Sequence, residues 1–468
     1  MDCRLEPSLI HAPAAPEAAA EHIQRLMTAE RRWAESQYGA NGIGAPATVG
    51  IVGAGVMGTA IAAAVVRHRI PVWIVDQDDR AVAAAPQRIT RRLDTLSGET
   101  QASAADVQQL VRTSRDLAAA ARCDFVIESV VEKLAVKQQL LAQLEPLVAP
   151  GTIVASNTST ISWAHLATSL HDPGRLCGCH FFLPLGQAAM METIRGERTR
   201  DDTIVAAIGF ANAIGHLPLV VADAPGFVVN RLLVPYLAEA MHLLTEGVSV
   251  DVVERAAEDF GMAMGPLRLL DEIGLDTALE CAWTMSGSSA SLVVRSPLLV
   301  AMVKAKHLGR KTQAGFFLYD GQDQGPSALN PHLAKTLARW PHPSQPHTAE
   351  TITWRLLTPM LLEATRMLQR GSVRDAGQID LAILCGFGFP ESRGGLLYWA
   401  DQLGAARIVQ LLGTLDYLGA RAQPTPLLLE MAQQDRRFFE PAIAGRSNGS
   451  KELADLGRNR PAGEQRES

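Results

Sequence analysis

Aromatic residues and positive charge are both scarce in this sequence. Phenylalanine, tyrosine and tryptophan make up 5% of its 468 residues, and acidic side chains outnumber basic ones, which gives a formal net charge of −6. A nucleic-acid-binding surface usually needs clustered lysine and arginine, often interleaved with aromatic residues. The sequence contains no such run, so we expect no nucleic acid partner.

Cysteine is scarce as well. The six cysteines are scattered along the chain, without the density of a secreted domain held together by disulfides. Cys177 and Cys179 form a Cys-x-Cys pair, but no second pair and no nearby His-x-x-x-His motif completes a zinc site. We expect reduced thiols and no bound metal.

A signal peptide and a clear membrane helix are also missing. The chain starts MDCRLEPSLIHAPAAP, with early acids and prolines in place of a basic start and an apolar core. The charge-free stretch from Ile43 to Val66 is long enough to span a membrane, but it contains Pro46 and several glycines. We therefore expect a cytoplasmic protein without a membrane segment.

The charge-free stretch instead fits a glycine turn between two apolar strands. Residues 48–52 (TVGIV) precede the turn, an apolar helical run follows it as far as Arg69, and a second apolar strand over 71–75 ends at Asp76. Asp76 lies 18 residues after the last turn glycine, close to the spacing of about 20 in dinucleotide-binding folds. The hydrophobic content of 47% is ordinary for such an α/β protein.

Each residue of this turn has a physical task. Gly53 allows the tight turn, Gly55 lets backbone N–H groups approach a pyrophosphate, and Gly58 lets the helix pack on the strand. Asp76 would accept hydrogen bonds from ribose hydroxyls and repel a 2′-phosphate, so NAD is favoured over NADP. The predicted cofactor contacts here are Gly53, Gly55, Val56, Met57, Gly58 and Asp76.

Further along, short polar segments recur in an order and spacing that together are highly specific. They are Glu128-Ser-Val-Val-Glu132 with Lys137, Ser156-Asn-Thr-Ser159, His180-Phe-Phe-Leu-Pro184, Glu192, Pro225-Gly-Phe-Val-Val-Asn-Arg231 and Met264-Gly-Pro266. With these segments the chain resembles the 3-hydroxyacyl-CoA dehydrogenase family from about Pro46 to about Pro441. Within that family it resembles the dehydrogenase half of the bacterial multifunctional fatty-acid oxidation α-subunit.

The resemblance implies roles for seven residues. His180 would be the catalytic base and Glu192 its carboxylate partner, while Ser159 and Asn230 would bind the reacting oxygen of the substrate. Glu132, Lys137 and Asn157 would line the cofactor and the nicotinamide end of the cleft.

The chemistry of alcohol oxidation calls for these residue types. A neutral imidazole such as that of His180 can take the hydroxyl proton near neutral pH. A carboxylate on its other ring nitrogen fixes the tautomer and stabilises the imidazolium that forms. A hydroxyl and an amide, as in Ser159 and Asn230, can bond to the oxygen without adding a competing titration.

Taken singly, these residues also have structural interpretations. A histidine at the end of an apolar run, as His180 is, is more often a structural residue, and Glu192 alone would be a solvated acid. Residues 156–159 could form only a strand-end turn or a helix N-cap, and Pro225-Gly226 only a turn between domains.

One position departs from the family pattern. The family usually carries asparagine three residues after the histidine, where this chain has Leu183. Leucine cannot donate a hydrogen bond, and the loss of one polar group that stabilises developing charge costs about 10²–10³ in rate. Activity on the usual substrates is therefore expected to be low or shifted.

The remainder of the chain contains an internal duplication. Apolar residues recur at helical spacing over 231–247 and again over 355–371, and the same offset of 124 residues relates Pro266 to Pro390. The second copy has Gly388-Phe389 in place of Met264-Gly265 and nothing like His180, so we expect it to be structural. The two copies would pack face to face and imitate within one chain a contact between two subunits.

The predicted architecture is an α/β Rossmann-type NAD domain followed by duplicated all-α C-terminal domains like those of 6-phosphogluconate dehydrogenase. A helix over about Pro16 to Tyr38, with Ile23, Leu26, Met27 and Trp33 on one side, would precede them. In the multifunctional subunit such a helix follows an enoyl-CoA hydratase domain, which we expect to be absent here. The expected ranges are 1–45 for the N-terminal extension, 46–228 for the NAD domain, 229–325 and 346–445 for the two helical domains, 326–345 for a linker and 446–468 for a disordered tail.

Three functions are compatible with these features. The first is NAD-dependent, reversible oxidation of L-3-hydroxyacyl-CoA to 3-oxoacyl-CoA in β-oxidation, with a separate enoyl-CoA hydratase and a thiolase as partners. The second is a dehydrogenase for a related substrate, either an acyl-carrier-protein thioester or a hydroxy acid, which Leu183 keeps open. The third is a non-catalytic NAD-binding scaffold, against which the retention of His180, Glu192, Ser159 and Asn230 speaks.

Overall fold

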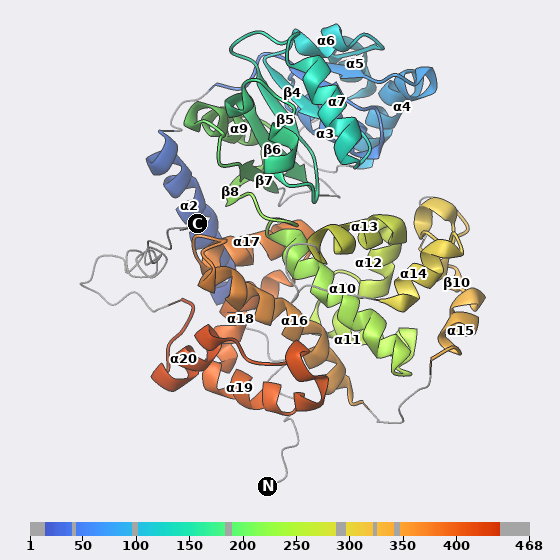
Figure 1. Cartoon of the computed structure of the whole chain (residues 1–468), viewed down its shortest axis with the longest axis vertical. Coiled ribbons are helices and arrows are strands. Elements are labelled where there is room, and N and C mark those ends of the chain that lie inside the picture. The colour runs from blue at the N-terminus through green and yellow to red at the C-terminus, as the bar shows by residue number, and fades with distance from the viewer. Residues whose placement is uncertain are drawn as a thin grey trace, which may run out of the picture.

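The chain forms an α/β part built on one sheet and a helical part packed below it (Figure 1). The computed structural model describes residues 15–39, 44–95, 102–182, 190–286, 296–321, 325–340 and 347–439. Leu183 and the predicted tail over 446–468 lie outside these ranges. None of the described helices is long and apolar enough to cross a membrane.

The sheet has eight strands in the order β3-β2-β1-β4-β5-β6-β7-β8. Strands β1 to β6 are parallel, whereas β7 runs antiparallel to β6 and β8 runs parallel to β7. The predicted Rossmann-type sheet is thereby confirmed. The strands are β1 (Val49–Val52), β2 (Val72–Val75), β3 (Val111–Ser114), β4 (Phe125–Glu128), β5 (Ile153–Ser156), β6 (Leu176–Phe181), β7 (Met190–Arg195) and β8 (Leu217–Ala222).

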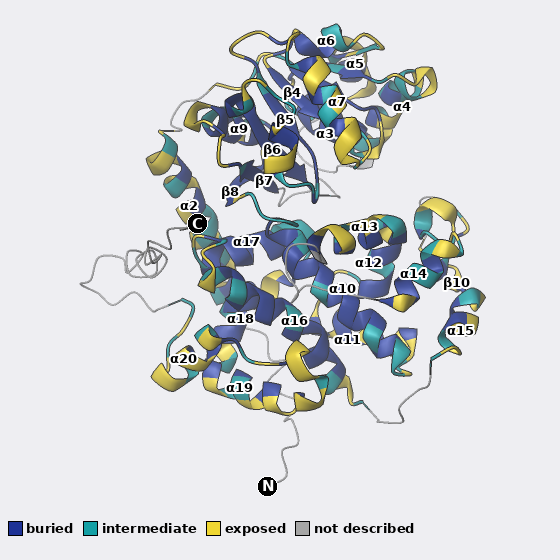
Figure 2. Ribbon diagram, viewed as in Figure 1, coloured by how far each residue is buried: buried dark blue, intermediate teal, exposed yellow. Residues whose placement is uncertain are grey.

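Helices cover the faces of this sheet and bury its apolar strands (Figure 2). Helix α3 carries the apolar run predicted after the glycine turn, and nine of its residues are buried. Cys177 and Cys179 are buried free thiols of β6. The helices of this part are α3 (Val56–Arg67), α4 (Asp79–Thr95), α5 (Ala104–Leu110), α6 (Leu117–Ala121), α7 (Leu134–Leu144), α8 (Trp163–Ala167) and α9 (Asp201–Ala213).

The helical part begins at α10, directly after the sheet. Its first half contains α10 (Val229–Thr245), α11 (Val250–Phe260), α12 (Pro266–Ile273), α13 (Leu275–Ser286), α14 (Pro297–Lys304), the hairpin of β9 (Phe317–Leu318) and β10 (Ala328–Leu329), and α15 (Pro331–Leu337). Its second half contains α16 (Ala349–Gln369), α17 (Ala376–Phe387), α18 (Leu396–Leu403), α19 (Ala405–Gly413) and α20 (Pro426–Gln434). The predicted helical region after the sheet is thus confirmed.

Two elements of the helical part extend beyond the patterns that the sequence shows. Helix α16 begins at Ala349, ahead of Arg355, because the Thr348 side chain caps it by accepting a hydrogen bond from Thr351 N. The expected linker over 326–345 contains strand β10 and helix α15. Helix α15 forms in a segment with turn-like composition because its proline occupies the first helical position, where no N–H is needed.

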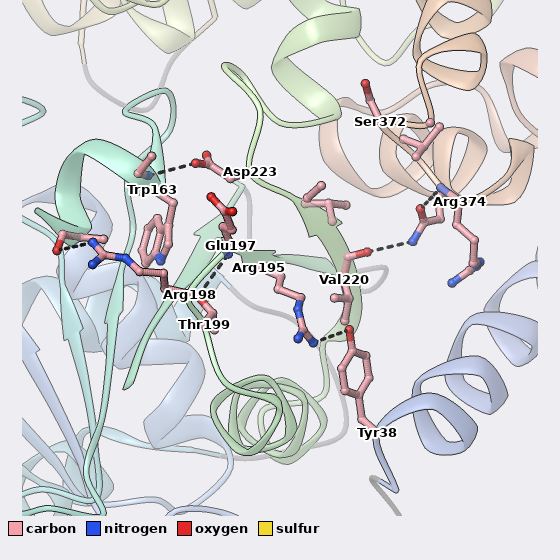
Figure 3. Close-up of a pocket in the computed structure, with 18 of the residues that line it drawn as sticks. Tyr38, Trp163, Arg195, Glu197, Arg198, Thr199, Val220, Asp223, Ser372 and Arg374 are labelled. Carbon is pink, nitrogen blue, oxygen red and sulfur yellow. Dashed lines mark hydrogen bonds between the residues drawn. The ribbon is translucent and has the colours of Figure 1, made fainter. Parts of the chain in front are cut away.

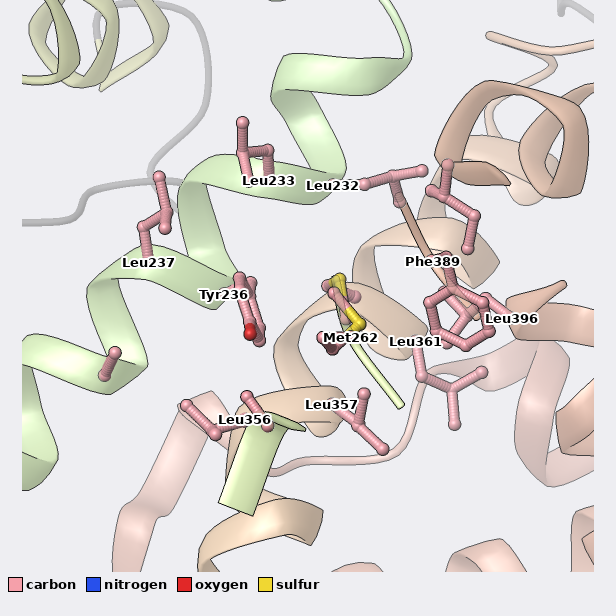
Figure 4. Packing of buried hydrophobic residues seen from close by; sticks show 14 of the residues in the cluster. Leu232, Leu233, Tyr236, Leu237, Met262, Leu356, Leu357, Leu361, Phe389 and Leu396 are labelled. Carbon is pink, nitrogen blue, oxygen red and sulfur yellow. The ribbon is translucent and has the colours of Figure 1, made fainter. Parts of the chain in front are cut away.

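Helices α10 and α16 pack against each other along the centre of the helical part. Leucines of α10, among them Leu232 and Leu233, share one buried cluster with Leu356, Leu357 and Leu361 of α16 (Figure 4). Two buried ion pairs cross the contact: Arg231 with Glu363 at 2.6 Å, and Arg355 with Glu239 at 2.5 Å. Both arginines and both glutamates are related by the offset of 124, so each repeat gives its arginine to the glutamate of the other.

This reciprocity is the property of a two-fold contact between equivalent surfaces. It supports the predicted duplication and its face-to-face packing, and the domain boundaries stay predictions.

Helix α2 (Pro16–Tyr38), present where it was predicted, joins the two parts. Its residues Ile23, Leu26 and Met27 pack on the helical core, and Trp33 packs on the core of the sheet. Glu30 of α2 forms a 2.5 Å ion pair with Arg374 of the second repeat.

Candidate active site

The glycine turn between β1 and α3 has the close contacts that explain its composition. A Cβ on Gly58 would lie 1.9 Å from the carbonyl oxygen of Gly53, and a Cβ on Gly53 would lie 2.3 Å from that of Ser129. Gly53 also has a φ of 116°, which favours glycine. Both positions therefore need glycine for packing, as predicted for Gly58 and for the turn at Gly53.

The start of α3 fits a pyrophosphate. Gly55 is the N-cap and provides no side-chain hydrogen bond to the first helical N–H groups, and a Cβ there would meet no atom within 4 Å. Val56 is 64% exposed, and Met57, one residue on, is partly buried. An anion can therefore reach the positive end of the α3 dipole.

Asp76 follows β2 and faces the same turn. Its Oδ2 accepts a hydrogen bond from Ala54 N at 2.8 Å, and its Oδ1 accepts one from Asp78 N at 3.0 Å. Because each carboxylate oxygen can accept two hydrogen bonds, Asp76 retains acceptor sites for ribose hydroxyls. The residues present thus fit an NAD molecule across the carboxyl ends of the strands.

His180 and Glu192 form a buried pair across the antiparallel strands β6 and β7. They are opposite each other in the register, and His180 Nδ1 lies 2.7 Å from Glu192 Oε2. The Glu192 side chain is completely buried and that of His180 is 5% exposed. With Nδ1 bound to the carboxylate, Nε2 is the ring nitrogen left to take a proton from a substrate.

Glu192 is held from its other side by backbone N–H groups. Its Oε1 accepts hydrogen bonds from Val228 N and Val229 N, each at 3.0 Å, at the start of α10. The chain reaches this point through Gly226 and Phe227, whose φ values of 78° and 49° are both positive. Positive φ is uncommon for a bulky residue such as Phe227, and it aims the two N–H groups at the carboxylate.

Ser159 and Asn230 also lie together. Asn230, in the first turn of α10, donates from Nδ2 to the carbonyl oxygen of Ser159 at 3.0 Å. Asn157, two residues before Ser159, accepts at Oδ1 a hydrogen bond from Phe181 N, next to His180. The loop after β5 and the start of α10 therefore both meet the His180–Glu192 pair.

Glu132 and Lys137 are engaged with this loop and with each other. Glu132 Oε1 accepts hydrogen bonds from Thr158 Oγ1 at 2.6 Å and from Ser159 N at 2.8 Å, and its Oε2 lies 3.2 Å from Lys137 Nζ. Burial raises the pKa of Glu132, but Lys137 and these hydrogen bonds outweigh that effect and lower it. Glu132 thus stays ionised and fixes the Ser159 loop.

Sequence reasoning missed two parts of this arrangement. Glu128, fully buried, accepts hydrogen bonds from Lys137 Nζ at 2.7 Å and from Ser156 Oγ. The sequence did contain a sign of this pair. Glu128 ends an apolar strand and Lys137 follows nine residues later, and an acid buried in this way needs a partner. The backbone N–H groups of Val228 and Val229 that donate to Glu192 could not be predicted from the sequence, because a backbone donor does not depend on the type of side chain.

A cavity of about 680 Å³ lies elsewhere, where α2, β7, β8 and residues 371–374 meet (Figure 3). Its lining includes none of the predicted catalytic residues. Two of its arginines are paired: Arg195 contacts Asp201 and the hydroxyl of Tyr38, and Arg374 contacts Glu30. We interpret this cavity as a junction between the two parts of the molecule and not as the reaction centre.

Comparison with protein families identifies both parts of the site. The NAD-binding domain of 3-hydroxyacyl-CoA dehydrogenase matches residues 48–224, and the C-terminal domain of the same family matches residues 226–319. The chain belongs to the 3-hydroxyacyl-CoA dehydrogenase family. It is an NAD-dependent dehydrogenase, as the sequence predicted.

Solved structures agree with this family. The 3-hydroxybutyryl-CoA dehydrogenase of Escherichia coli is 26% identical with a TM-score of 0.68, over 83% of this chain and 99% of that chain. The (S)-3-hydroxybutyryl-CoA dehydrogenase of Ralstonia eutropha is 36% identical with a TM-score of 0.55, over 59% of this chain and 100% of that chain.

The dehydrogenase part of multifunctional enzyme 1 from Caenorhabditis elegans is also similar. It is 24% identical with a TM-score of 0.58, over 82% of this chain and 89% of that chain, which shows the shared fold.

Proposed function

We propose that His180 is the general base of a reversible L-3-hydroxyacyl-CoA oxidation and that Glu192 orients it. The observation that carries the proposal is the buried contact of 2.7 Å between His180 Nδ1 and Glu192 Oε2 at the carboxyl end of β6. Nε2 of His180 then takes the proton of the substrate hydroxyl, and the carboxylate stabilises the imidazolium that results. The glycine turn and Asp76 would hold NAD, which would supply the hydride acceptor for C3 of the substrate.

Ser159 and Asn230 are proposed to hold the reacting oxygen. They lie on different segments that are joined by a hydrogen bond from Asn230 Nδ2 to Ser159 O. Hydrogen bonds that are preorganised at an oxygen with developing charge lower the barrier without reorganisation during the reaction. In the reverse direction, protonated His180 donates its proton to the 3-oxo group.

The proposed biological setting is fatty-acid β-oxidation in the cytoplasm. A separate enoyl-CoA hydratase would supply the 3-hydroxyacyl-CoA, and a thiolase would consume the 3-oxoacyl-CoA. Both partners follow from the chemistry of substrate and product and from the resemblance to the multifunctional subunit. A dehydrogenase for an acyl-carrier-protein thioester or a hydroxy acid is the second candidate, and Leu183 is the residue that favours it.

A comparison of substrates tests the proposal. Purified protein is given NADH with acetoacetyl-CoA, with a medium-chain 3-oxoacyl-CoA, with acetoacetyl-acyl-carrier protein or with acetoacetate, and the loss of NADH absorbance is followed. The proposal predicts the highest kcat/KM for a CoA thioester. A higher value for the carrier-protein thioester or for acetoacetate would replace it with the second candidate. No turnover with any of them, together with NADH binding by fluorescence, would favour a non-catalytic scaffold.

A further inference from the structure

The second helical repeat touches the turn that holds Glu192. Helix α17 ends beside the start of α10, and Gly386 faces Val229 there. A Cβ on Gly386 would lie 2.7 Å from one γ-methyl carbon of Val229 and 2.9 Å from the other. Non-bonded carbon atoms prefer about 3.5–4.0 Å, so any other residue at this position must displace Val229.

The backbone of α17 does not itself require glycine at this position. Gly386 has no positive φ, and the left-handed cap of α17 is Gly388. Inside a helix glycine is less favourable than alanine by about 0.5–1 kcal/mol. The close approach to Val229 is therefore the feature of the structure that explains Gly386.

Val229 is buried and also carries one of the two backbone donors of Glu192. Its side chain is 1% exposed within the shared core, and its own N–H donates to Glu192 Oε1 at 3.0 Å. The residue before the N-cap, Phe227, is already in the left-handed conformation. We therefore expect that a displaced Val229 would also displace its backbone N–H, and with it the Glu192 carboxylate that orients His180.

Helix α17 is itself fixed against the sheet and so cannot retreat. The buried Gln378 of α17 donates from Nε2 to Val220 O of β8 at 2.9 Å. Asp380 accepts hydrogen bonds from Leu397 N and Tyr398 N, which ties α17 to α18. The position of Gly386 relative to β7 and β8 is therefore set by contacts independent of Val229.

We propose that Gly386 is a positioning residue of the dehydrogenase reaction, through which the second repeat sets the distance between Glu192 and His180. This inference rests on the proposed roles of His180 and Glu192. It assigns the second repeat a part in catalysis.

A double-mutant cycle between Gly386 and Val229 tests the inference. Gly386→Ala is expected to lower kcat for NADH oxidation with acetoacetyl-CoA by about tenfold, because misplacements below 1 Å already affect reactions of this kind. The Kd of NADH should stay within about twofold, since the glycine turn at α3 is not involved. In a Val229→Ala background, which leaves room for a Cβ, Gly386→Ala should cause no further loss of kcat.

The matched control is Gly413→Ala at the end of α19. A Cβ there would meet no atom within 4 Å, so kcat should remain that of the wild type and the thermal midpoint should not fall. An unchanged kcat in Gly386→Ala would overturn the inference, as would an equal loss in both Val229 backgrounds. If Gly386→Ala fails to fold, Val229→Ile crowds the same contact from the side of α10. The inference then predicts that this single substitution lowers kcat.

A spectroscopic measurement separates this inference from the proposed function. In protein with labelled histidine, a proton shared by His180 Nδ1 and Glu192 is expected to give a downfield resonance whether or not a substrate turns over. The inference predicts that Gly386→Ala shifts this resonance upfield and that Val229→Ala in the same chain restores it. A resonance unmoved by Gly386→Ala would contradict the inference even if the wild type were active. Turnover that is absent in the wild type would instead contradict the proposed function alone.

Discussion

At Glu192 both carboxylate oxygens are committed, one to His180 and one to backbone N–H groups of Val228 and Val229. Glu192→Gln replaces one of these acceptors with an amide donor, which opposes either the two N–H groups or the Nδ1–H of His180. We expect kcat to fall by about 10²-fold or more, as for other orienting carboxylates, with little change in the Kd of NADH. Stopped-flow kinetics and NADH fluorescence measure the two quantities.

Glu145→Gln provides the control for this substitution. Glu145 lies outside the candidate site and caps the chain at His171 and Asp172. Its substitution should affect stability but not kcat. Equal losses of kcat in the two variants would mean that the effect of Glu192→Gln is not a matter of orientation.

Another residue-scale prediction concerns pH. Burial raises the pKa of Glu254 from 4.5 to about 7, although backbone N–H groups at Leu267 and Arg268 and the charge of Arg268 oppose this. The folded chain then holds a proton that the unfolded chain has lost, so stability falls as the pH rises from about 4.5 to about 7. Glu254→Gln should remove this contribution. Urea unfolding of both proteins across that range measures it, and parallel stability curves would refute it.

The candidate site could be predicted where a side chain carries the chemistry. His180, Glu192, Ser159 and Asn230 stand in a specific order in the sequence, and the structure pairs His180 with Glu192 and Ser159 with Asn230, while their catalytic roles stay predictions. The backbone donors to Glu192 and the approach of Gly386 could not be predicted, because they depend on distances between segments far apart in the chain.

At the scale of elements, the contact between α10 and α16 depends on two buried ion pairs. Removing one partner of a buried pair leaves an uncompensated charge and costs about 3–5 kcal/mol. Arg231→Met leaves Glu363, which is completely buried, without its closest partner. We expect a decrease of about 3 kcal/mol or more in the free energy of unfolding, measured by urea denaturation.

Two further proteins complete this test. Arg436→Met breaks the exposed pair with Glu430 and should cost about 1 kcal/mol or less. Arg231→Met combined with Glu363→Leu removes both charges and should regain most of the lost stability. A double variant as unstable as Arg231→Met would show that the ion pair is not the cause.

The elements themselves were predictable in type more than in extent. The periodicity of apolar residues predicted α10 and the strands on either side of the glycine turn, because their apolar patterns are strong. The early start of α16 depends on the Thr348 cap, and α15 forms in a segment rich in turn residues. Short segments of this kind follow their tertiary contacts more than their composition.

At the scale of the molecule, the two helical repeats share one hydrophobic core. The same cluster contains Leu232, Leu243 and Phe260 of the first repeat and Leu361 and Trp399 of the second. A chain that ends at residue 325 would expose the α10 surface that now faces α16. We expect such a chain to self-associate or aggregate, which size-exclusion chromatography detects, and a stable monomer would contradict the shared core.

The overall arrangement was predictable from the repeat at offset 124 and from the order of the motifs. The route of α2 along both parts of the molecule was not. Its contacts with the core of the sheet and with the segment before α17 are made by single residues such as Trp33 and Glu30. The amphipathic pattern of a helix predicts that one side is buried, but it does not predict which two surfaces the helix will contact.

The most direct test of the account is the turnover of His180→Ala compared with His171→Ala, whose side chain is fully exposed. A positioned general base contributes about 10²–10⁴ in rate, so kcat with acetoacetyl-CoA should fall by that factor in His180→Ala and not change in His171→Ala. NADH should bind equally to both. A His180→Ala protein that retains the turnover of the wild type would show that this histidine is not the base and would contradict the central claim.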